Sequence, residues 1–364
     1  MDSRQRVSLA LAHEQPDRVP VDYWATSEVT HGLLQRFDCS TQEQLLQRFD
    51  VDFRYIDGPR YIGPEPEVHA DGSAEDHWGV PRVLVEVGAG ARTSRYWEVV
   101  KFPLADAQSV ADVLRYPKWP QPEWFDYACV REQVAQARRT GKVVVFMGDR
   151  TNRCAQLKPA MYVRGVEQIL LDLVLAPDLA ECIFRRITEF YLEYARRTFE
   201  AAGDGIDVFF MGDDFGTQNG PFMSPAMWRR LLRPGFQAMV DLAKRRGYKV
   251  AHHSCGSIKP IIPDLIDCGL DILNPVQPDV HDMDRAELKR EFGDRLSFHG
   301  SISIQRTLPF GTPEDVRSEV RERCETLGRG GGFIFCTAHN IQADTPLENV
   351  EALFEAYRQF GRYE

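Results

Sequence analysis

The chain has 364 residues, a formal net charge of −10, 43% hydrophobic residues and 27% charged residues. These proportions are ordinary for a globular enzyme, and the acidic balance argues against nucleic acid as a partner. No apolar run approaches the roughly 20 residues that a membrane-spanning helix needs, so no membrane association is expected.

The cysteines and the N-terminus point to a reduced compartment. The eight cysteines are scattered and form no CxxC pair, and the first residues hold no apolar segment of the secretory kind. We therefore expect a cytoplasmic protein, in which most thiols serve as small core residues.

Short β-branched or aromatic runs alternate with longer helical patterns, which is typical of a parallel sheet wrapped by helices. Strands are predicted at residues 18–24, 51–56, 143–148, 207–212, 249–254, 271–275, 296–300 and 332–336. Eight strands in βα alternation is the number that closes a barrel. The sequence therefore predicts an α/β fold, a single (β/α)8 TIM barrel over residues 1–364.

The alternation is interrupted between the second and third predicted strands, where residues 57–142 are too many for one crossover. Residues 83–87 and 95–100 alternate as strands do and flank a turn rich in glycine, Gly88-Ala89-Gly90, which predicts a β-hairpin. We expect this insertion to cover one end of the barrel. Two amphipathic helices are predicted within residues 163–202.

Helix starts are indicated by cap residues. Ser224 and Thr312 each precede a proline, and Asp284 stands three residues before a glutamate. Thr345 precedes Pro346, with Glu348 at the spacing of a capping box.

Polar residues gather at the predicted strand ends, where barrel enzymes carry their chemistry. They are Asp213 and Asp214 after the fourth strand, His253 and Cys255 at the fifth, Asn274 and Gln277 at the sixth, His299 at the seventh, and Cys336 and His339 at the eighth.

The fifth strand end predicts a metal site. Side chains alternate along a strand, so His253 and Cys255 point to one face and His252 to the other. An imidazole and a thiolate on one face can bind zinc, which takes nitrogen and sulfur ligands in tetrahedral geometry. The eighth strand end offers Cys336 and His339 as further ligands.

Other roles remain open for several of these residues. Asp213 and Asp214 are candidates for acid/base catalysis, because adjacent carboxylates can raise one another's pKa, or one of them caps the following turn. His339 is a candidate general acid or substrate-binding group as well as a ligand. Cys336 is alternatively a buried core residue.

Five residues are candidates for substrate binding: Asn274, Gln277, His299, His77 and Trp78. The two amides could orient a substrate or serve as ordinary loop amides. His77 and Trp78 could cover the mouth of the barrel, or Trp78 could belong to a small core within the insertion.

The chain resembles the uroporphyrinogen decarboxylase superfamily over nearly its whole length. The resemblance is carried by residues 14–21 (EQPDRVPV), 253–256 (HSCG), 271–277 (DILNPVQ) and 339–349 (HNIQADTPLEN). It implies the same barrel fold.

True uroporphyrinogen decarboxylases have two arginines in an N-terminal Arg-Gln-Ala-Gly-Arg-Tyr pattern. At the matching place this chain has residues 25–30 (ATSEVT), which include no arginine. Because a substrate with eight carboxylates needs guanidinium groups to bind it, the resemblance does not extend to that activity.

The other branch of the superfamily holds methyltransferases that work with corrinoid proteins, including the methylcobalamin:coenzyme M enzymes. Similarity to them implies a zinc ion held by a His-x-Cys pair and a later cysteine. His253 and Cys255 match the pair, whereas the third position falls on His339 rather than Cys336. A His, Cys, His set carries one negative charge less, which makes a bound thiol less nucleophilic and the metal a stronger Lewis acid.

The resemblance implies a zinc-dependent methyltransferase that moves a methyl group between a small methylated compound, such as an aryl methyl ether, and a corrinoid protein or thiol. The corrinoid would be carried by that partner, and a homodimer is expected because barrels of this type often pair. A metal-free decarboxylase or lyase acting on a small carboxylic acid is the alternative. The non-enzymatic alternative is a barrel that binds a tetrapyrrole or corrinoid and catalyses no reaction.

Overall fold

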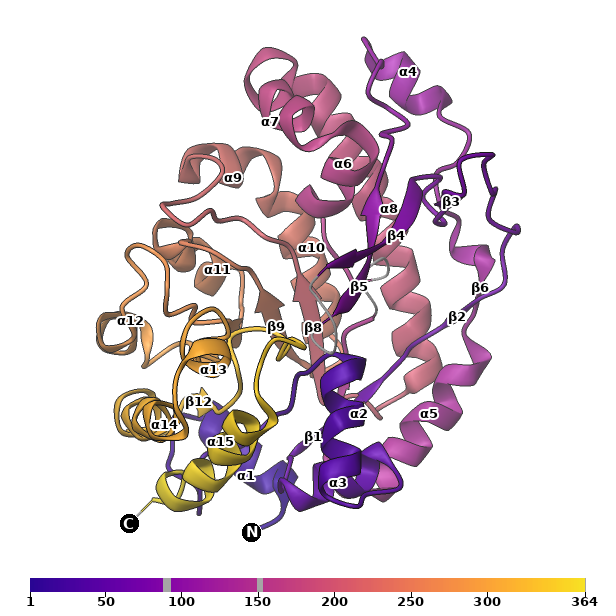
Figure 1. Ribbon diagram of the computed structural model, residues 1–364. Helices are drawn as coiled ribbons and strands as arrows, with labels where there is room; N and C mark the ends of the chain where they lie inside the picture. The colour runs from indigo at the N-terminus through magenta and orange to yellow at the C-terminus, as the bar shows by residue number, and fades with distance from the viewer. Residues whose placement is uncertain (88–92, 149–152, 364) are drawn as a thin grey trace.

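The computed structural model describes residues 1–87, 93–148 and 153–363, so the glycines predicted at the hairpin turn lie outside the described residues. Its central element is a parallel sheet of seven strands in the order β1-β7-β8-β9-β10-β11-β12. The strands are β1 (Phe53–Ile56), β7 (Val143–Phe146), β8 (Val208–Gly212), β9 (Lys249–His253), β10 (Ile272–Asn274), β11 (Ser297–His299) and β12 (Phe333–Ile334). Each coincides with a predicted strand, and helices surround the curled sheet (Figure 1).

The first predicted strand, residues 18–24, is not a regular strand, and this prediction was wrong in that respect. The segment nevertheless lies between the two edges of the sheet. Asp22 N donates to the carbonyl of Phe335, which follows β12, and Asp52 N, just before β1, donates to the carbonyl of Val21. Pro20 supplies no N–H and the segment makes single bridges rather than a ladder, which explains the irregular structure.

A buried carboxylate holds this segment to the sheet. Asp52 is fully buried and accepts hydrogen bonds from Ser3 Oγ, Arg6 Nη1, Arg18 Nη1 and Val21 N at 2.7–2.9 Å. These donors come from the first helix and from the irregular segment, so one side chain fastens both to the start of β1.

The helices pack on the outside of the sheet, with α1 at its N-terminal end. They are α1 (Ser3–Leu11), α2 (Ser27–Arg36), α3 (Gln42–Arg48), α6 (Leu157–Arg164), α7 (Val166–Leu175), α8 (Pro177–Ala202), α9 (Pro225–Leu231), α10 (Arg233–Lys244), α11 (Ile262–Asp267), α12 (Arg285–Phe292), α13 (Thr307–Phe310), α14 (Pro313–Leu327) and α15 (Leu347–Phe360). A short 3-10 helix, η3 (Lys259–Ile261), precedes α11.

The cap predictions hold for α9, α12 and α14, whose N-caps are Ser224, Asp284 and Thr312. The capping box predicted at Thr345 is wrong. The backbone of Pro346 is extended at ψ 134°, so α15 begins one residue later and has no side-chain cap.

The segment between β1 and β7 forms the predicted hairpin. It contains β2 (Arg60–Tyr61), β3 (Ala74–Glu75), β4 (Pro81–Val87), β5 (Ser94–Val99), α4 (Val110–Arg115), η2 (Pro122–Trp124), β6 (Phe125–Asp126) and α5 (Ala128–Arg139). Strands β4 and β5 pair antiparallel with Val85 opposite Tyr96. Figure 1 shows this hairpin near the ends of β8 and β9.

Two apolar clusters follow from the alternation of the strands. Val143, Val208, Phe210 and Ala251 point into the curled sheet, where they meet Val7 of α1. The opposite faces of the strands pack against the surrounding helices. Along β9, Ala251 and His253 therefore point inward. No helix in the described part of the chain is long and apolar enough to cross a membrane.

Candidate metal centre

The C-terminal end of β9 carries the central pair of the site. His253 is 4% exposed and lies on the inner face of the sheet, as the alternation predicts. His252 points the other way and packs against Phe215 and Phe236, with ring centroids 5.1 Å away in both cases. Phe215 N donates to Ser254 Oγ, which ties the loop after β8 to the turn that presents Cys255.

A close approach of two backbones sets the position of Cys255. Gly256 has φ +89°, and a Cβ there would lie 2.4 Å from the carbonyl carbon of Gly216. Only glycine accommodates both that φ and that contact. The loops after β8 and β9 are thereby held together beside the thiol.

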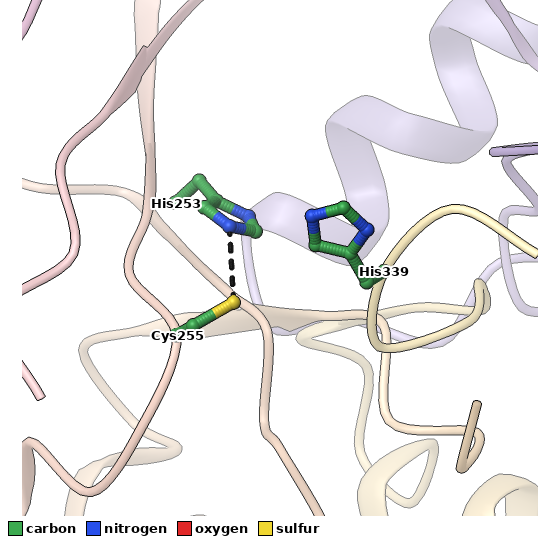
Figure 2. A group of neighbouring side chains, drawn as sticks. All are labelled: His253, Cys255 and His339. Carbon is green, nitrogen blue, oxygen red and sulfur yellow. Dashed lines mark hydrogen bonds between the residues drawn. The ribbon is translucent and has the colours of Figure 1, made fainter. Parts of the chain in front are cut away.

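His253, Cys255 and His339 form one group of potential ligands, whose ligand atoms all lie within 4.8 Å of one another (Figure 2). His253 Nε2 is 3.2 Å from Cys255 Sγ. Zinc bound tetrahedrally at about 2.0 Å from nitrogen and 2.3 Å from sulfur would separate these atoms by roughly 3.5 Å. The pair therefore fits a zinc ion with a small adjustment.

His339 fits by distance but has a hydrogen bond that opposes ligation. The backbone N–H of Asn340 donates to His339 Nδ1 at 2.8 Å, so the lone pair of Nδ1 is in use. In a neutral imidazole the proton then resides on Nε2. Ligation through Nε2 would require that proton to move to Nδ1, which breaks the bond from Asn340. Ligation through Nδ1 would require only that bond to open.

Burial controls the protonation of the central pair. Burial lowers the pKa of His253 to about 3, although the Asp214 carboxyl opposes this effect. Burial, reinforced by Asp214, raises the pKa of the Cys255 thiol to about 12. Near neutral pH a protonated thiol therefore faces a neutral imidazole, and a metal ion would replace the thiol proton.

The two adjacent aspartates have different surroundings. Asp213 is 2% exposed and accepts the backbone N–H groups of Gln156, Leu157 and Lys158 at 2.6–2.8 Å, so it caps α6. Burial raises the pKa of Asp213 to about 7, against the effect of these three donors. The alternative placed such a cap on the turn that follows the strand, whereas Asp213 caps a helix earlier in the chain.

Asp214 lies at the site itself. Its Oδ1 accepts from Cys255 N at 3.0 Å and is 3.6 Å from His253 Nε2, while its Oδ2 pairs with Lys158. Burial raises the pKa of Asp214, but the interactions with His253 and Lys158 outweigh burial and hold that pKa below its usual range. Asp214 is therefore ionised near neutral pH. An ionised carboxylate can balance positive charge at the site, but it has no proton to donate.

Cys336 belongs to a second, fully buried group with Asp22 and His299. Its side chain lies among the apolar residues inside the sheet, and burial raises the pKa of its thiol well above the ordinary value. Among the described residues, the structure thus groups His339 rather than Cys336 with His253 and Cys255.

The predicted substrate-binding residues separate into two sets. Gln277 lines a cavity and accepts from Gly256 N at 2.8 Å, and Trp78 lines another. Asn274 and His299 are 0% and 2% exposed and hydrogen-bond to one another beneath the site. His77 lies in an aromatic cluster of the insertion, 5.5 Å from the Phe125 ring.

Two cavities adjoin the group. A cavity of about 430 Å³ is lined by both histidines and, among others, by Thr26, Trp78, Tyr162, Tyr191 and Arg153. A more open cavity of about 620 Å³ is lined by Cys255, Gln277, Gln305 and other residues. Tyr96, His339 and Gln342 line both, and Tyr96 Oη donates to Gln342 Oε1 at 2.5 Å.

Several lining residues were not anticipated. Tyr96 comes from the hairpin, and Tyr162 and Lys158 come from α6. Lys158 lies in the first turn of α6, and a lysine there opposes the helix dipole and indicates a specific partner, but no helix was predicted at residues 157–162. Arg153 left no signal in the sequence, because only the tertiary structure brings it beside Gly212, where a Cβ would lie 2.2 Å from Arg153 Cδ.

Comparisons with known proteins agree on one family. The model of the family described as uroporphyrinogen decarboxylase (URO-D) matches residues 154–360. The methylcobamide:CoM methyltransferase MtaA of Methanosarcina barkeri is 31% identical over 183 residues, which are 50% of each chain. A uroporphyrinogen decarboxylase of Coxiella burnetii is 23% identical over 273 residues, 72% of this chain and 70% of that protein.

The chain thus spans about half the length of the methyltransferase relative that it matches. Among solved structures, a methyltransferase from Methanosarcina mazei covers 99% of both chains with a TM-score of 0.65 at 21% identity. At that identity the likeness shows the fold alone.

Proposed function

This chain belongs to the uroporphyrinogen decarboxylase family, and we propose that it is a methyltransferase that depends on zinc. It moves a methyl group between a small methylated compound and a corrinoid protein or a thiol. The similarity to MtaA over half the chain supports methyl transfer. The observation that carries the proposal is the pair formed by His253 Nε2 and Cys255 Sγ, 3.2 Å apart on the inner face of the sheet.

In this proposal His253, Cys255 and His339 would hold the zinc ion, and catalytic zinc sites with three protein ligands also bind water or substrate. When bound, zinc supplies a Lewis acid that polarises the atom carrying the methyl group. Asp214 and Lys158 remain an ion pair next to the ligands and balance the charge there. Asn340 must release His339 Nδ1 for the third ligand to bind.

The two cavities provide separate places for donor and acceptor. The smaller one has aromatic walls at Trp78, Tyr162 and Tyr191, which suits a methoxylated aromatic donor. The more open one lies beside Cys255 and leaves room for the acceptor to approach. His339 lines both cavities, so the methyl group can be transferred beside His339 while the donor stays in its own cavity.

The direct test combines metal analysis with a transfer assay. Purified protein and the Cys255→Ala variant are compared for bound zinc and for methyl transfer from methoxylated aromatics to reduced cobalamin. Cys129→Ala is the control, because Cys129 lies in α5, far along the chain and outside the ligand group. The proposal expects loss of both zinc and transfer in Cys255→Ala only. Negligible zinc in all three proteins contradicts it.

One observation favours a second candidate, a metal-free carboxy-lyase acting on a small acid. The Asn340 N–H to His339 Nδ1 hydrogen bond leaves a proton on Nε2, which suits proton donation to a carbanion. Arg153 and Lys158 line the same cavity as His339 and suit a carboxylate. Carbon dioxide release that survives exhaustive chelation would favour this candidate.

The organisation of the whole chain completes the proposal. We propose that residues 1–364 form one domain, with residues 57–142 as an insertion whose hairpin contributes Tyr96 to both cavities. The corrinoid in this proposal is carried by a partner protein.

A further inference from the structure

Beneath the candidate metal centre runs a chain of buried hydrogen bonds that crosses the inside of the curled sheet. Successive members are His253, Asn274, His299, Asp22 and Tyr55, contributed by β9, β10, β11, the segment before α2, and β1. The heavy-atom distances along it are 2.5, 2.7, 2.9 and 2.5 Å. The first four members are at most 4% exposed.

The orientation of the Asn274 amide is fixed by a backbone carbonyl. Asn274 Nδ2 donates to the carbonyl oxygen of His299 at 3.3 Å, and a carbonyl can only accept. The nitrogen of the amide therefore faces His299, and Oδ1 faces His253. The register of the sheet brings this about, because Asn274 is the direct neighbour of His253 on β10.

The proton positions on both histidines follow from that orientation. Asn274 Oδ1 can only accept, so His253 Nδ1 must carry the proton and Nε2 keeps a lone pair toward Cys255. The second N–H of Asn274 Nδ2 donates to His299 Nδ1, so the proton of His299 resides on Nε2. That proton is donated to Asp22 Oδ2 at 2.9 Å.

Asp22 is an acceptor at the far end of the chain. Its Oδ2 also accepts from Tyr55 Oη, and its Oδ1 accepts from Tyr23 N at 2.8 Å. Trp24 Nε1 in turn donates to Tyr55 Oη at 2.8 Å, and the Trp24 ring lies against His299 with centroids 5.3 Å apart. The direction of each hydrogen bond agrees with the next.

We propose that Asn274, His299 and Asp22 are positioning residues that hold His253 in the tautomer whose Nε2 lone pair faces the metal position. This inference rests on the proposed metal site for its use, although the tautomer can be measured without any metal. It also gives Asn274 and His299 a role different from substrate binding, since both side chains have their hydrogen-bonding groups engaged within the chain of bonds.

Breaking the chain of bonds should change which nitrogen of His253 carries the proton. Without the acceptor at His299 Nδ1, only the longer bond to the backbone carbonyl of residue 299, at 3.3 Å, favours the present orientation of the Asn274 amide. The amide can then turn over in part of the molecules and present Nδ2 to His253 Nδ1. The proton of His253 would then move to Nε2, and the lone pair would no longer face Cys255. Mutation of the hydrogen-bond partners of metal-binding histidines typically weakens metal binding by about 10–100-fold.

The first experiment is long-range proton–nitrogen correlation NMR of the metal-free protein with labelled histidines. We expect His253 with its proton on Nδ1 and His299 with its proton on Nε2. A proton on Nε2 of His253 in the wild-type protein overturns the inference, whatever the variants do.

The second experiment measures zinc affinity by competition with a chelator, and the absorption spectrum with Co²⁺ as a probe. We expect His299→Leu to lose the single His253 tautomer and to bind zinc about 10–100-fold more weakly. His299→Gln offers a side-chain oxygen as acceptor and should retain more of the affinity. His252→Leu is the matched control, because His252 is equally buried on the opposite face of β9.

The outcomes separate the two proposals. Zinc affinity in His299→Leu within twofold of the wild type overturns the positioning role. If the wild-type protein binds no zinc, the proposed function fails, and the NMR experiment still decides the inference by itself.

Discussion

His253 Nε2 lies 3.2 Å from Cys255 Sγ, with a neutral imidazole facing a protonated thiol. In the absence of metal the thiol can donate its proton to the imidazole lone pair. A divalent ion that replaces this proton meets two ligands already close to tetrahedral spacing.

The third ligand can be identified by comparing His339→Asn with Cys336→Ala. His339 belongs to the ligand group, whereas Cys336 lies inside the sheet with Asp22 and His299. We expect His339→Asn to lose most of the bound zinc and Cys336→Ala to retain it, with a lower melting temperature because a buried side chain is truncated. Metal content after gel filtration gives the result, and the reverse pattern would assign Cys336 as the ligand.

Zinc affinity should rise with pH. Burial raises the pKa of the Cys255 thiol to about 12 and lowers the pKa of His253 to about 3. Between pH 6 and pH 8 the metal-free thiol stays protonated and the imidazole stays neutral, so binding releases one proton. The apparent association constant should therefore increase about tenfold per pH unit. Chelator competition at three pH values measures it, and an affinity independent of pH would exclude Cys255 as a ligand.

Removing the carboxylate of Asp52 should destabilise the protein. Asp52 is fully buried and pairs with both Arg6 and Arg18, so its loss removes the carboxylate partner of Arg18 and leaves Arg6 paired with Asp17. We expect Asp52→Ala to lower the free energy of unfolding by about 3–5 kcal/mol. Asp126→Ala, which removes an exposed pair with Arg60, should cost about 1 kcal/mol or less. Equal denaturation midpoints for the two variants would contradict this account.

The hydrogen bond between Tyr96 and Gln342 should matter for the methyl donor. It joins the hairpin to the loop after β12, at the point where the two cavities meet. We expect Tyr96→Phe to raise the KM for the donor several-fold, while the melting temperature changes little, since one hydrogen bond contributes about 0.5–1.5 kcal/mol. Trp97→Phe is the control, because Trp97 is 49% exposed. If the KM for the donor is the same in both variants, Tyr96 does not contribute to donor binding.

Strand alternation and the positions of strand ends made much of this site accessible to prediction. The inward direction of His253 and the outward direction of His252 follow from the period of two, and the structure confirms both. The seven parallel strands were predicted because short apolar runs between long helical patterns have few other solutions. The irregular structure of residues 18–24 was not predicted, because the pairing of this segment depends on the distant residues Asp52 and Phe335.

Local sequence determined which residues reach the C-terminal edge of the sheet, since strand period and length are local properties. Only the tertiary structure decided what each one does there. It grouped His339 with His253 and Cys255, put Cys336 with His299, and used Asp213 as a cap for α6. These roles depend on which buried donor meets which acceptor, and such partners come from segments far apart in the chain.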